Sequence, residues 1–168
     1  AMLGSDPMST ILTAAVVGLA VTLVANVTTT VYLHRAASHR ALTLARPVVF
    51  GFRVLTWITT GIRPRQWVAV HRKHHAFTDV EGDPHSPVLL GWVKVQMRNV
   101  ALYRREAANP ETVARYAKDL PADRWDRALF DHALVGLAIG IGILVAAFGW
   151  TVGLLAAFVH LNLYLGGS

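Results

Sequence analysis

Apolar residues are distributed unevenly along this chain, and three long runs hold most of them. The first run, residues 11–31, reads ILTAAVVGLAVTLVANVTTTV and contains no charged residue. A helix of this length crosses a hydrocarbon core of about 30 Å, so the run predicts a transmembrane helix. A signal peptide is the weaker alternative, because no basic region precedes the run and it ends at histidine and arginine.

The last run, residues 133–168, contains no Asp, Glu, Lys or Arg and is too long for one crossing. Gly149-Trp150 is the natural turn, since a flexible residue is followed there by an interfacial aromatic. Two helices, residues 134–148 and 151–165, are therefore predicted as a transmembrane hairpin. Close packing is expected at three glycines of the first helix: Gly136, Gly140 and Gly142.

The middle run, residues 47–62, is shorter and includes Arg53. It predicts an amphipathic helix lying at the membrane interface with Arg53 on its water-facing side, and a true span is the alternative. Further along, Asn109-Pro110 and Leu120-Pro121 mark chain breaks, so residues 111–120 predict a short surface helix.

All 16 Lys and Arg residues lie between Arg35 and Arg127, which predicts a cytoplasmic location for that segment. Only 15% of the residues are charged and 54% are hydrophobic, a composition that favours a membrane protein. We read the cationic segment as membrane topology and expect no nucleic-acid partner. The predicted location is the inner membrane of a bacterium. The chain would be an integral membrane protein there, with the polar segment facing the cytoplasm.

The predicted fold class is all-α, an integral membrane protein with three transmembrane helices plus interfacial and cytoplasmic helices. Residues 1–7, AMLGSDP, resemble an expression scar before a native start at Met8. Residues 8–168 then form one core. It consists of the first span, a polar segment over residues 34–128, and the hairpin of residues 133–168.

Histidines are concentrated in the polar segment. His71, His74 and His75 are spaced three and four residues apart, which places them on one face of a helix. His34 and His39 are five apart, or about 140° on a straight α-helix. Either that helix ends between them or they serve different metal ions. The chain has no cysteine, so any metal must be held by His, Asp, Glu, Asn or water, and imidazole suits iron, zinc, copper and nickel.

The other histidines have plainer explanations. His85 and His132 are read as polar surface, and His160, in an apolar run, as a hydrogen-bonded packing residue with direct metal ligation as the alternative. A membrane zinc protease is excluded, because no His-Glu-x2-His motif occurs.

The stretches HRAASHR and HRKHHAFTDVEGDPHSP resemble the first two histidine boxes of the membrane fatty acid desaturases, most closely the stearoyl-CoA (acyl-CoA) type. The resemblance extends over essentially the whole native chain. It implies an oxidoreductase of fatty acid biosynthesis, in which a di-iron centre uses O2 to introduce a double bond into an acyl chain. Five residues would ligate the irons: His34, His39, His71, His74 and His75.

The resemblance also implies supporting residues around the ligands. Trp67 matches a family tryptophan and would line the acyl tunnel. Substrate phosphates or lipid headgroups would meet the basic residues Lys94, Arg98, Arg104 and Arg105. Carboxylates orient metal-bound imidazoles, and Asp79, Glu81 and Asp83 are the nearest acids, with a solvated turn as the alternative. His85 would join them in this supporting role. Arg72 and Lys73 are read as cations that disfavour protonation of the imidazoles.

The chain does not contain the third histidine box of the family. We therefore interpret the chain as a truncated desaturase that is expected to be inactive by itself. A half-filled site could hold zinc or nickel in place of iron. The expected partners are a fatty acyl-CoA or acyl-lipid, O2, the bilayer, and a ferredoxin-, rubredoxin- or cytochrome b5-like electron donor with its reductase. A related di-iron lipid hydroxylase or ketolase, or a non-catalytic metal-binding membrane protein, is the alternative.

Overall fold

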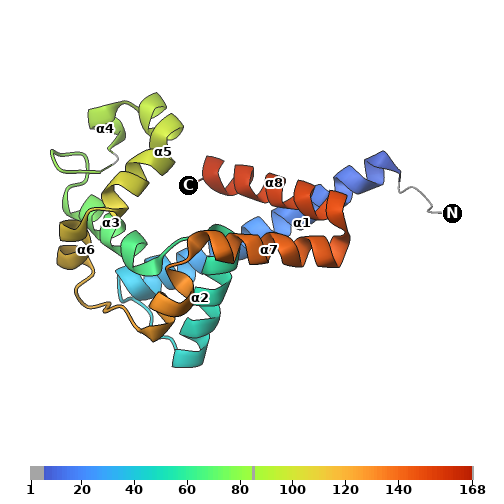
Figure 1. Ribbon diagram of the computed structural model, residues 1–168. Helices are drawn as coiled ribbons and strands as arrows, with labels where there is room; N and C mark the ends of the chain where they lie inside the picture. The colour runs from blue at the N-terminus through green and yellow to red at the C-terminus, as the bar shows by residue number, and fades with distance from the viewer. Residues whose placement is uncertain (1–5, 85, 168) are drawn as a thin grey trace.

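The computed structural model describes residues 6–84 and 86–167, and every regular element in those residues is a helix (Figure 1). The side chains of Trp92, Lys94, Gln96 and Met97 lie outside the described part, as does His85. The all-α fold class is therefore confirmed for the described residues.

The helices are α1 (Pro7–Thr28), the π-helix η1 (Thr29–Ser38), α2 (Arg46–Thr60), α3 (Pro64–Ala76), α4 (Pro87–Leu90), α5 (Trp92–Ala107), α6 (Pro110–Tyr116), the π-helix η2 (Asp126–Phe130), α7 (Ala133–Phe148) and α8 (Trp150–Gly166). Proline stands in the first turn of α1, α2, α3, α4 and α6. Its missing N–H has no helical partner there in any case, so proline marks where these helices begin. The predicted surface helix over residues 111–120 is shorter than expected, since α6 ends at Tyr116.

Helices α1, α7 and α8 form an apolar bundle in which glycines permit close approach. A Cβ at Gly18 of α1 would lie 2.8 Å from the Val159 side chain of α8, so no larger residue fits. Gly140 of α7 packs on the backbone of Ile58 in α2, and Gly136 packs on Trp57. Gly142 has nothing within 4 Å of its Cβ position, so the packing predicted for it is wrong.

The helix boundaries predicted for the hairpin hold to within one residue, because Gly149 ends α7 with a φ of 81° that a side-chain-bearing residue rarely adopts. In the described residues, one helix is both long and apolar enough to cross a membrane, the 32-residue helix Pro7–Ser38. Only 22% of its most apolar window is buried. Helices α7 and α8 are apolar but shorter, at 16 and 17 residues.

His160 ties three helices together inside the bundle. Its Nε2 atom lies 2.8 Å from the carbonyl oxygen of Thr59 in α2, and its Nδ1 atom lies 3.1 Å from the hydroxyl of Thr22 in α1. The carbonyl can only accept, so Nε2 carries the proton. The imidazole is 4% exposed with both nitrogens hydrogen-bonded within the protein, which is the packing role expected from the sequence.

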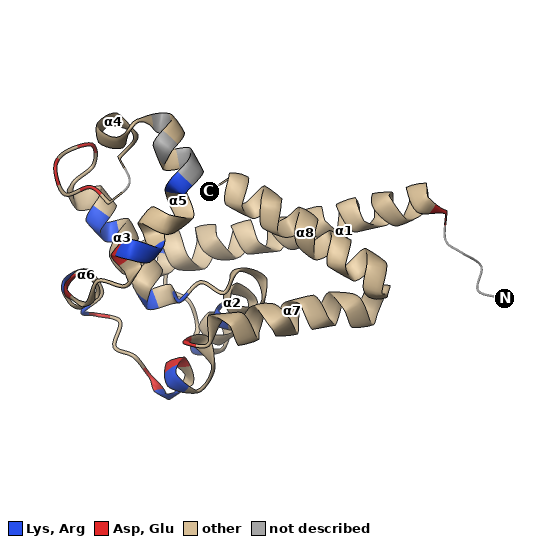
Figure 2. Ribbon diagram, turned by 45° about the horizontal axis from the view of Figure 1, so that its top comes forward, with Lys and Arg blue, Asp and Glu red and all other residues tan. Residues whose placement is uncertain are grey.

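Charged residues gather at one end of the molecule, over α3, α5 and α6 and the segment before α7, while α1, α7 and α8 carry almost none (Figure 2). Arg53 of α2 belongs to that charged end. Its side chain is 12% exposed, donates to Asp123 and Asp126 at 2.6 to 3.1 Å, and lies over the Phe130 ring. The predicted water-facing position of Arg53 is wrong, because two carboxylates from the segment before α7 cover it.

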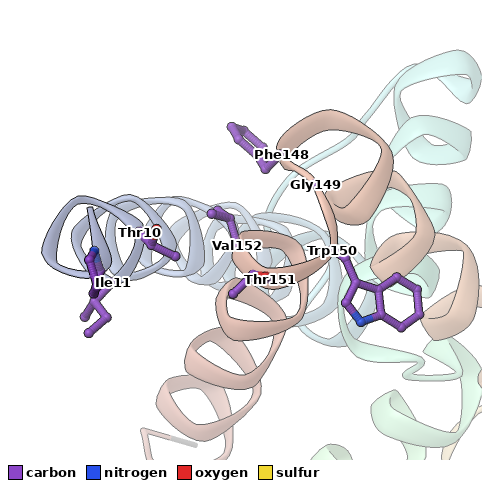
Figure 3. Close-up of a pocket in the computed structure, with 8 residues that line it drawn as sticks. Thr10, Ile11, Phe148, Gly149, Trp150, Thr151 and Val152 are labelled. Carbon is purple, nitrogen blue, oxygen red and sulfur yellow. The ribbon is translucent and has the colours of Figure 1, made fainter. Parts of the chain in front are cut away.

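The opposite end of the bundle has a shallow hollow of about 490 Å³ where the α7–α8 turn meets the start of α1 (Figure 3). Its lining is Pro7, Thr10, Ile11, Phe148, Gly149, Trp150, Thr151 and Val152. None of these side chains titrates or binds a metal strongly. A candidate metal or catalytic site is therefore sought at the charged end of the molecule.

Candidate metal centre

The first two histidines are brought together by the π-helix η1. The His39 amide donates to the His34 carbonyl at 3.1 Å, which is an i→i+5 bond. Such a bond stacks residue i+5 over residue i, whereas an α-helix would turn the two side chains far apart. The hydroxyl of Ser38 donates in the same sense to the Leu33 carbonyl at 2.8 Å and supports the wider turn. The centroids of the His34 and His39 rings consequently lie 4.5 Å apart.

The second pair comes from α3, where His71 and His75 are one helical turn apart. Their Nε2 atoms lie 3.2 Å apart, and the ring of Trp67, one turn earlier, stacks on His71 at 4.7 Å. This helix packs against η1, and the His34 and His71 rings are 4.8 Å apart. The predicted proximity of the two boxes is therefore present in the fold.

Four of the five predicted ligands share one cluster. One nitrogen from each of His34, His39, His71 and His75 lies within 4.8 Å of the others. His71 is central, with its Nε2 atom 3.2 Å from that of His75 and 3.3 Å from that of His39.

These spacings fit a metal ion better than a hydrogen-bond network. A neutral imidazole nitrogen is either one donor or one acceptor, so Nε2 of His71 cannot satisfy both neighbours well. Two nitrogens that bind one tetrahedral ion at about 2.0–2.1 Å lie about 3.3 Å apart. The two spacings at His71, 3.2 and 3.3 Å, match that value, while the four ligand nitrogens together spread over as much as 4.8 Å.

His74 differs from the cluster, since its ligand atom is not among the four that converge. Its Nδ1 atom lies 2.9 and 3.0 Å from the two carboxylate oxygens of Asp83, whose side chain is fully buried. A carboxylate accepts only, so this contact places the proton on Nδ1 and the lone pair on Nε2. Asp83 thus has the contact expected of an acid that orients an imidazole.

The two described acids that were also expected to orient the ligands, Asp79 and Glu81, make no hydrogen bond or ion pair with the four histidines. The carboxylate of Asp79 accepts from Ser86 at 2.7 Å, and its amide donates to Asp83, so it shapes the loop around Asp83. Asp79 has a φ of 59°, a left-handed conformation that this loop imposes. Glu81 is exposed, and His85 lies outside the described residues.

The surroundings disfavour protonation of His71 and His75. Burial lowers the pKa of His71 from 6.5 to about 3, with smaller contributions from the neighbouring histidines. Burial also lowers the pKa of His75, followed by the effects of His39 and His74. Metal ligation requires the neutral ring, so this environment favours binding of a cation.

Comparison with known proteins agrees with this geometry. The fatty acid desaturase family matches residues 10–167, nearly the full length of the chain. The chain belongs to the fatty acid desaturase family. No solved structure matches it.

Curated relatives of this chain include desaturases and an acetylenase, according to their names. The sn-1 stearoyl-lipid 9-desaturase of Synechocystis is 27% identical over 79% of this chain and 40% of its own length. Delta-9 desaturase-like 3 protein of Arabidopsis thaliana is 35% identical over 47% of the chain and 25% of its own length. Hex-5-enoyl-[acyl-carrier protein] acetylenase of Moorena producens is 40% identical over 33% of the chain and 17% of its own length. The matches thus span less than half of each relative.

The predicted substrate residues of this chain are spread over two helices, α3 and α5. Trp67 lies within the cluster, stacked on His71. Arg98, Arg104 and Arg105 are exposed on α5, which packs against α3, and the side chain of Lys94 lies outside the described part. No recorded contact links these cations to the histidines.

The sequence did not predict the ion-pair partners of Arg72 and Lys73, the two cations between the histidines of α3. Lys73 pairs with Glu106 of α5 at 2.7 Å, and Arg72 pairs with Asp119 at 2.6 Å. The acids lie 33 and 47 residues further along the chain, so no local spacing shows the pairing. The available signal was that both cations adjoin proposed ligands on a helix whose preceding turn, Val68, Ala69 and Val70, is buried.

Proposed function

We propose that this chain supplies the first two histidine boxes of a fatty acid desaturase, and that His34, His39, His71 and His75 bind an iron ion of its di-iron centre. The observation that supports this proposal is the convergence of four ligand nitrogens within 4.8 Å, drawn from two segments about 35 residues apart. Structural histidines pair with oxygens or amides, whereas these nitrogens face one another.

His74 is proposed as a fifth ligand, through Nε2, to the second iron. Asp83 holds its Nδ1 proton and fixes the orientation of the ring. The desolvated surroundings of His71 keep the lone pairs available near neutral pH. When bound, iron supplies the activation of O2 that allows two hydrogens to be removed from an acyl chain.

Five histidines with one nitrogen each are too few for two iron ions. They fill one four-coordinate ion and leave a single ligand for the other. We therefore propose that further ligands come from parts of the desaturase outside these 168 residues. By itself the chain is expected to bind one ion, zinc or nickel as readily as iron, and to show no turnover.

The proposed membrane arrangement has three crossings, Pro7–Ser38, α7 and α8, with the charged end in the cytoplasm. An α-helix of 16 residues is about 24 Å long, somewhat less than a typical hydrocarbon core of about 30 Å. Trp150 is 71% exposed at the α7–α8 turn, which suits an interfacial position. A single cysteine at the exposed Ala108 tests the orientation, since the chain has no other cysteine. Labelling from the cytoplasmic side only is expected, and labelling from the outer side only would contradict the arrangement.

The proposed substrate is a long-chain fatty acyl group, with an external ferredoxin-, rubredoxin- or cytochrome b5-like donor supplying electrons. The names of the relatives include lipid-linked and carrier-protein-linked chains, so the acyl-CoA carrier predicted from the sequence is one option among three. Arg98, Arg104 and Arg105 are proposed to meet the anionic headgroup or carrier at the membrane surface.

Fatty acid analysis tests this function. The complete desaturase that contains this chain is expressed in a host lacking the activity, and its fatty acids are analysed by mass spectrometry. A new double bond is expected, and it should disappear in His71→Ala while remaining in His132→Ala, a histidine outside the cluster. A hydroxylated or ketone product would instead show a sister enzyme, and no modified lipid with well-folded protein would contradict the proposal.

A further inference from the structure

Arg72 stands between two proposed ligands in sequence, but its side chain leaves the cluster and makes an extensive set of contacts. All five N–H groups of the guanidinium have an acceptor. Nε donates to the Ser38 carbonyl at 3.0 Å, and Nη2 donates to the Ala37 carbonyl at 2.8 Å. The remaining donors reach the Tyr116 carbonyl at 2.8 Å and both carboxylate oxygens of Asp119 at 2.6 and 3.1 Å.

The first two acceptors are carbonyls at the end of η1, the helix that holds His34 and His39. That helix ends at Ser38, before residues 42 and 43 could donate to them through i→i+5 bonds. A cation at this position satisfies the carbonyls and also faces the negative end of the helix dipole.

Asp119, just beyond α6, anchors the other side of the guanidinium. It also accepts from Arg40 at 2.6 Å, and Arg40 has a φ of 53° immediately after the end of η1. The two arginines hold the pKa of the Asp119 carboxyl well below its usual range, so the carboxyl stays ionised at any pH near neutrality. One ion-paired group therefore joins η1, α3 and α6.

We propose that Arg72 is a positioning residue that sets the distance between the two histidine boxes by clamping the last turn of η1 to α3 and α6. The inference rests on the proposed function, since it treats the histidines as ligands of one ion. The clamp keeps the His39 ring beside His71, because Ala37 and Ser38 immediately precede His39 in the chain. Arginine is required, since lysine offers three donors and no planar fork for Asp119.

Lys73 provides a matched control in the neighbouring position. Its side chain is 20% exposed, as is that of Arg72, and it also pairs with an acid distant in sequence. Its partner Glu106 lies on α5, and its recorded hydrogen bond does not reach η1. Loss of Lys73 therefore removes a comparable ion pair without loosening the first box.

The experiment compares the full chain with Arg72→Lys, Asp119→Asn and Lys73→Gln in detergent micelles. Co2+ is titrated alone, and its visible absorption reports the number and symmetry of nitrogen ligands. Amide hydrogen exchange is followed at His39 and Ala41, which donate to the carbonyls of His34 and Arg35 at 3.1 and 2.9 Å. Circular dichroism and exchange in α7 and α8 check that each variant is folded.

Arg72→Lys is expected to weaken Co2+ binding about 10- to 100-fold, the range for losing an orienting partner, and to change the Co2+ spectrum. Exchange at His39 and Ala41 should accelerate at least about tenfold, as expected when local hydrogen bonds open. Asp119→Asn should act in the same direction, and Lys73→Gln should leave both readouts within about threefold of the parent chain.

Unchanged exchange in Arg72→Lys, or equal loosening in Lys73→Gln, would overturn the clamp. A parent chain that binds no Co2+ would overturn the proposed metal site instead. In that case the exchange data would still decide the clamp, because they need no metal.

Discussion

The histidine cluster and His160 place the same residue type in opposite surroundings. Both nitrogens of His160 face protein oxygens, at 2.8 and 3.1 Å, and neither faces another imidazole. In the cluster, Nε2 of His71 faces two other imidazole nitrogens at 3.2 and 3.3 Å, and at most one contact can be a good hydrogen bond. The difference shows that the atoms facing each nitrogen, more than burial, separate packing histidines from candidate ligands.

The two regions also reach their positions by different forces. Helices α1, α7 and α8 meet through glycines and apolar side chains, with His160 as a polar tie. The segments that carry the cluster are joined by a charged group, since Arg72 of α3 bonds the end of η1 and pairs with Asp119. Substitutions in the two regions should therefore separate metal affinity from stability.

The largest expected effect is on metal binding in His71→Ala. Loss of the central ligand should lower Zn2+ affinity at least about 100-fold, the upper end for losing even an orienting partner. His160→Ala should leave the affinity within about threefold, because that ring faces oxygens on α1 and α2. Calorimetric titration of the two variants with Zn2+ in micelles measures the difference in affinity. Equal losses of Zn2+ affinity would contradict the distinction between the cluster and His160.

A second prediction sharpens the role assigned to Asp83. Asp83→Asn should lower metal affinity about 10- to 100-fold, because the amide orients His74 less well and lowers its basicity. Glu81→Gln is the control, since Glu81 is an exposed acid of the same loop. The same titration measures both, and an effect in Glu81→Gln as large as in Asp83→Asn would show that overall charge, not orientation, is responsible.

A third prediction concerns stability alone. His160→Leu should lower the free energy of unfolding by about 1 kcal/mol, within the range of hydrogen bonds between membrane helices. Asn162→Leu on the same helix should cost less, because the Asn162 amide donates only to the Phe158 carbonyl one turn away. Denaturant titration followed by circular dichroism tests the pair. A stability loss confined to Asn162→Leu would contradict the interhelical tie.

The smallest expected effect is the response of the charged end to acid. Hydrogen bonds from Arg53 hold the pKa of Asp123 well below its usual value of 3.8. The folded state then binds fewer protons than the unfolded state, so this contribution is complete above about pH 4 and is lost as pH falls further. It should amount to at most about 1 kcal/mol, since Asp123 is 45% exposed. Asp123→Asn should flatten the stability curve below pH 4, and an unchanged curve would refute the assignment.

The sequence predicted the helices whose ends carry a strong local signal. Gly149 sets the α7–α8 turn, and the run of residues 11–31 lies within the long first helix. The proximity of the two boxes was predicted as well, since both precede or follow apolar helices.

Other features depend on contacts distant in sequence and could not be predicted. The π-helix that aligns His34 with His39 packs against α3, which is distant in sequence, whereas ideal α-helical geometry separates the two residues. Arg53 was placed in water because Asp123 and Asp126 lie about 70 residues away. His74 was grouped with its neighbours by spacing and by the family resemblance, and its hydrogen bond to Asp83, nine residues further along, could not be read from either.

X-ray absorption of the Zn2+-loaded chain tests the central claim, that the four histidines form one metal site, most directly. The account predicts three or four nitrogen neighbours at about 2.0–2.1 Å with the outer-shell scattering of imidazole rings. In His71→Ala this imidazole signal should decrease, with water oxygen replacing nitrogen in any ion that remains. A first shell made only of oxygen in the parent chain, or a spectrum that His71→Ala leaves unchanged, would contradict the account.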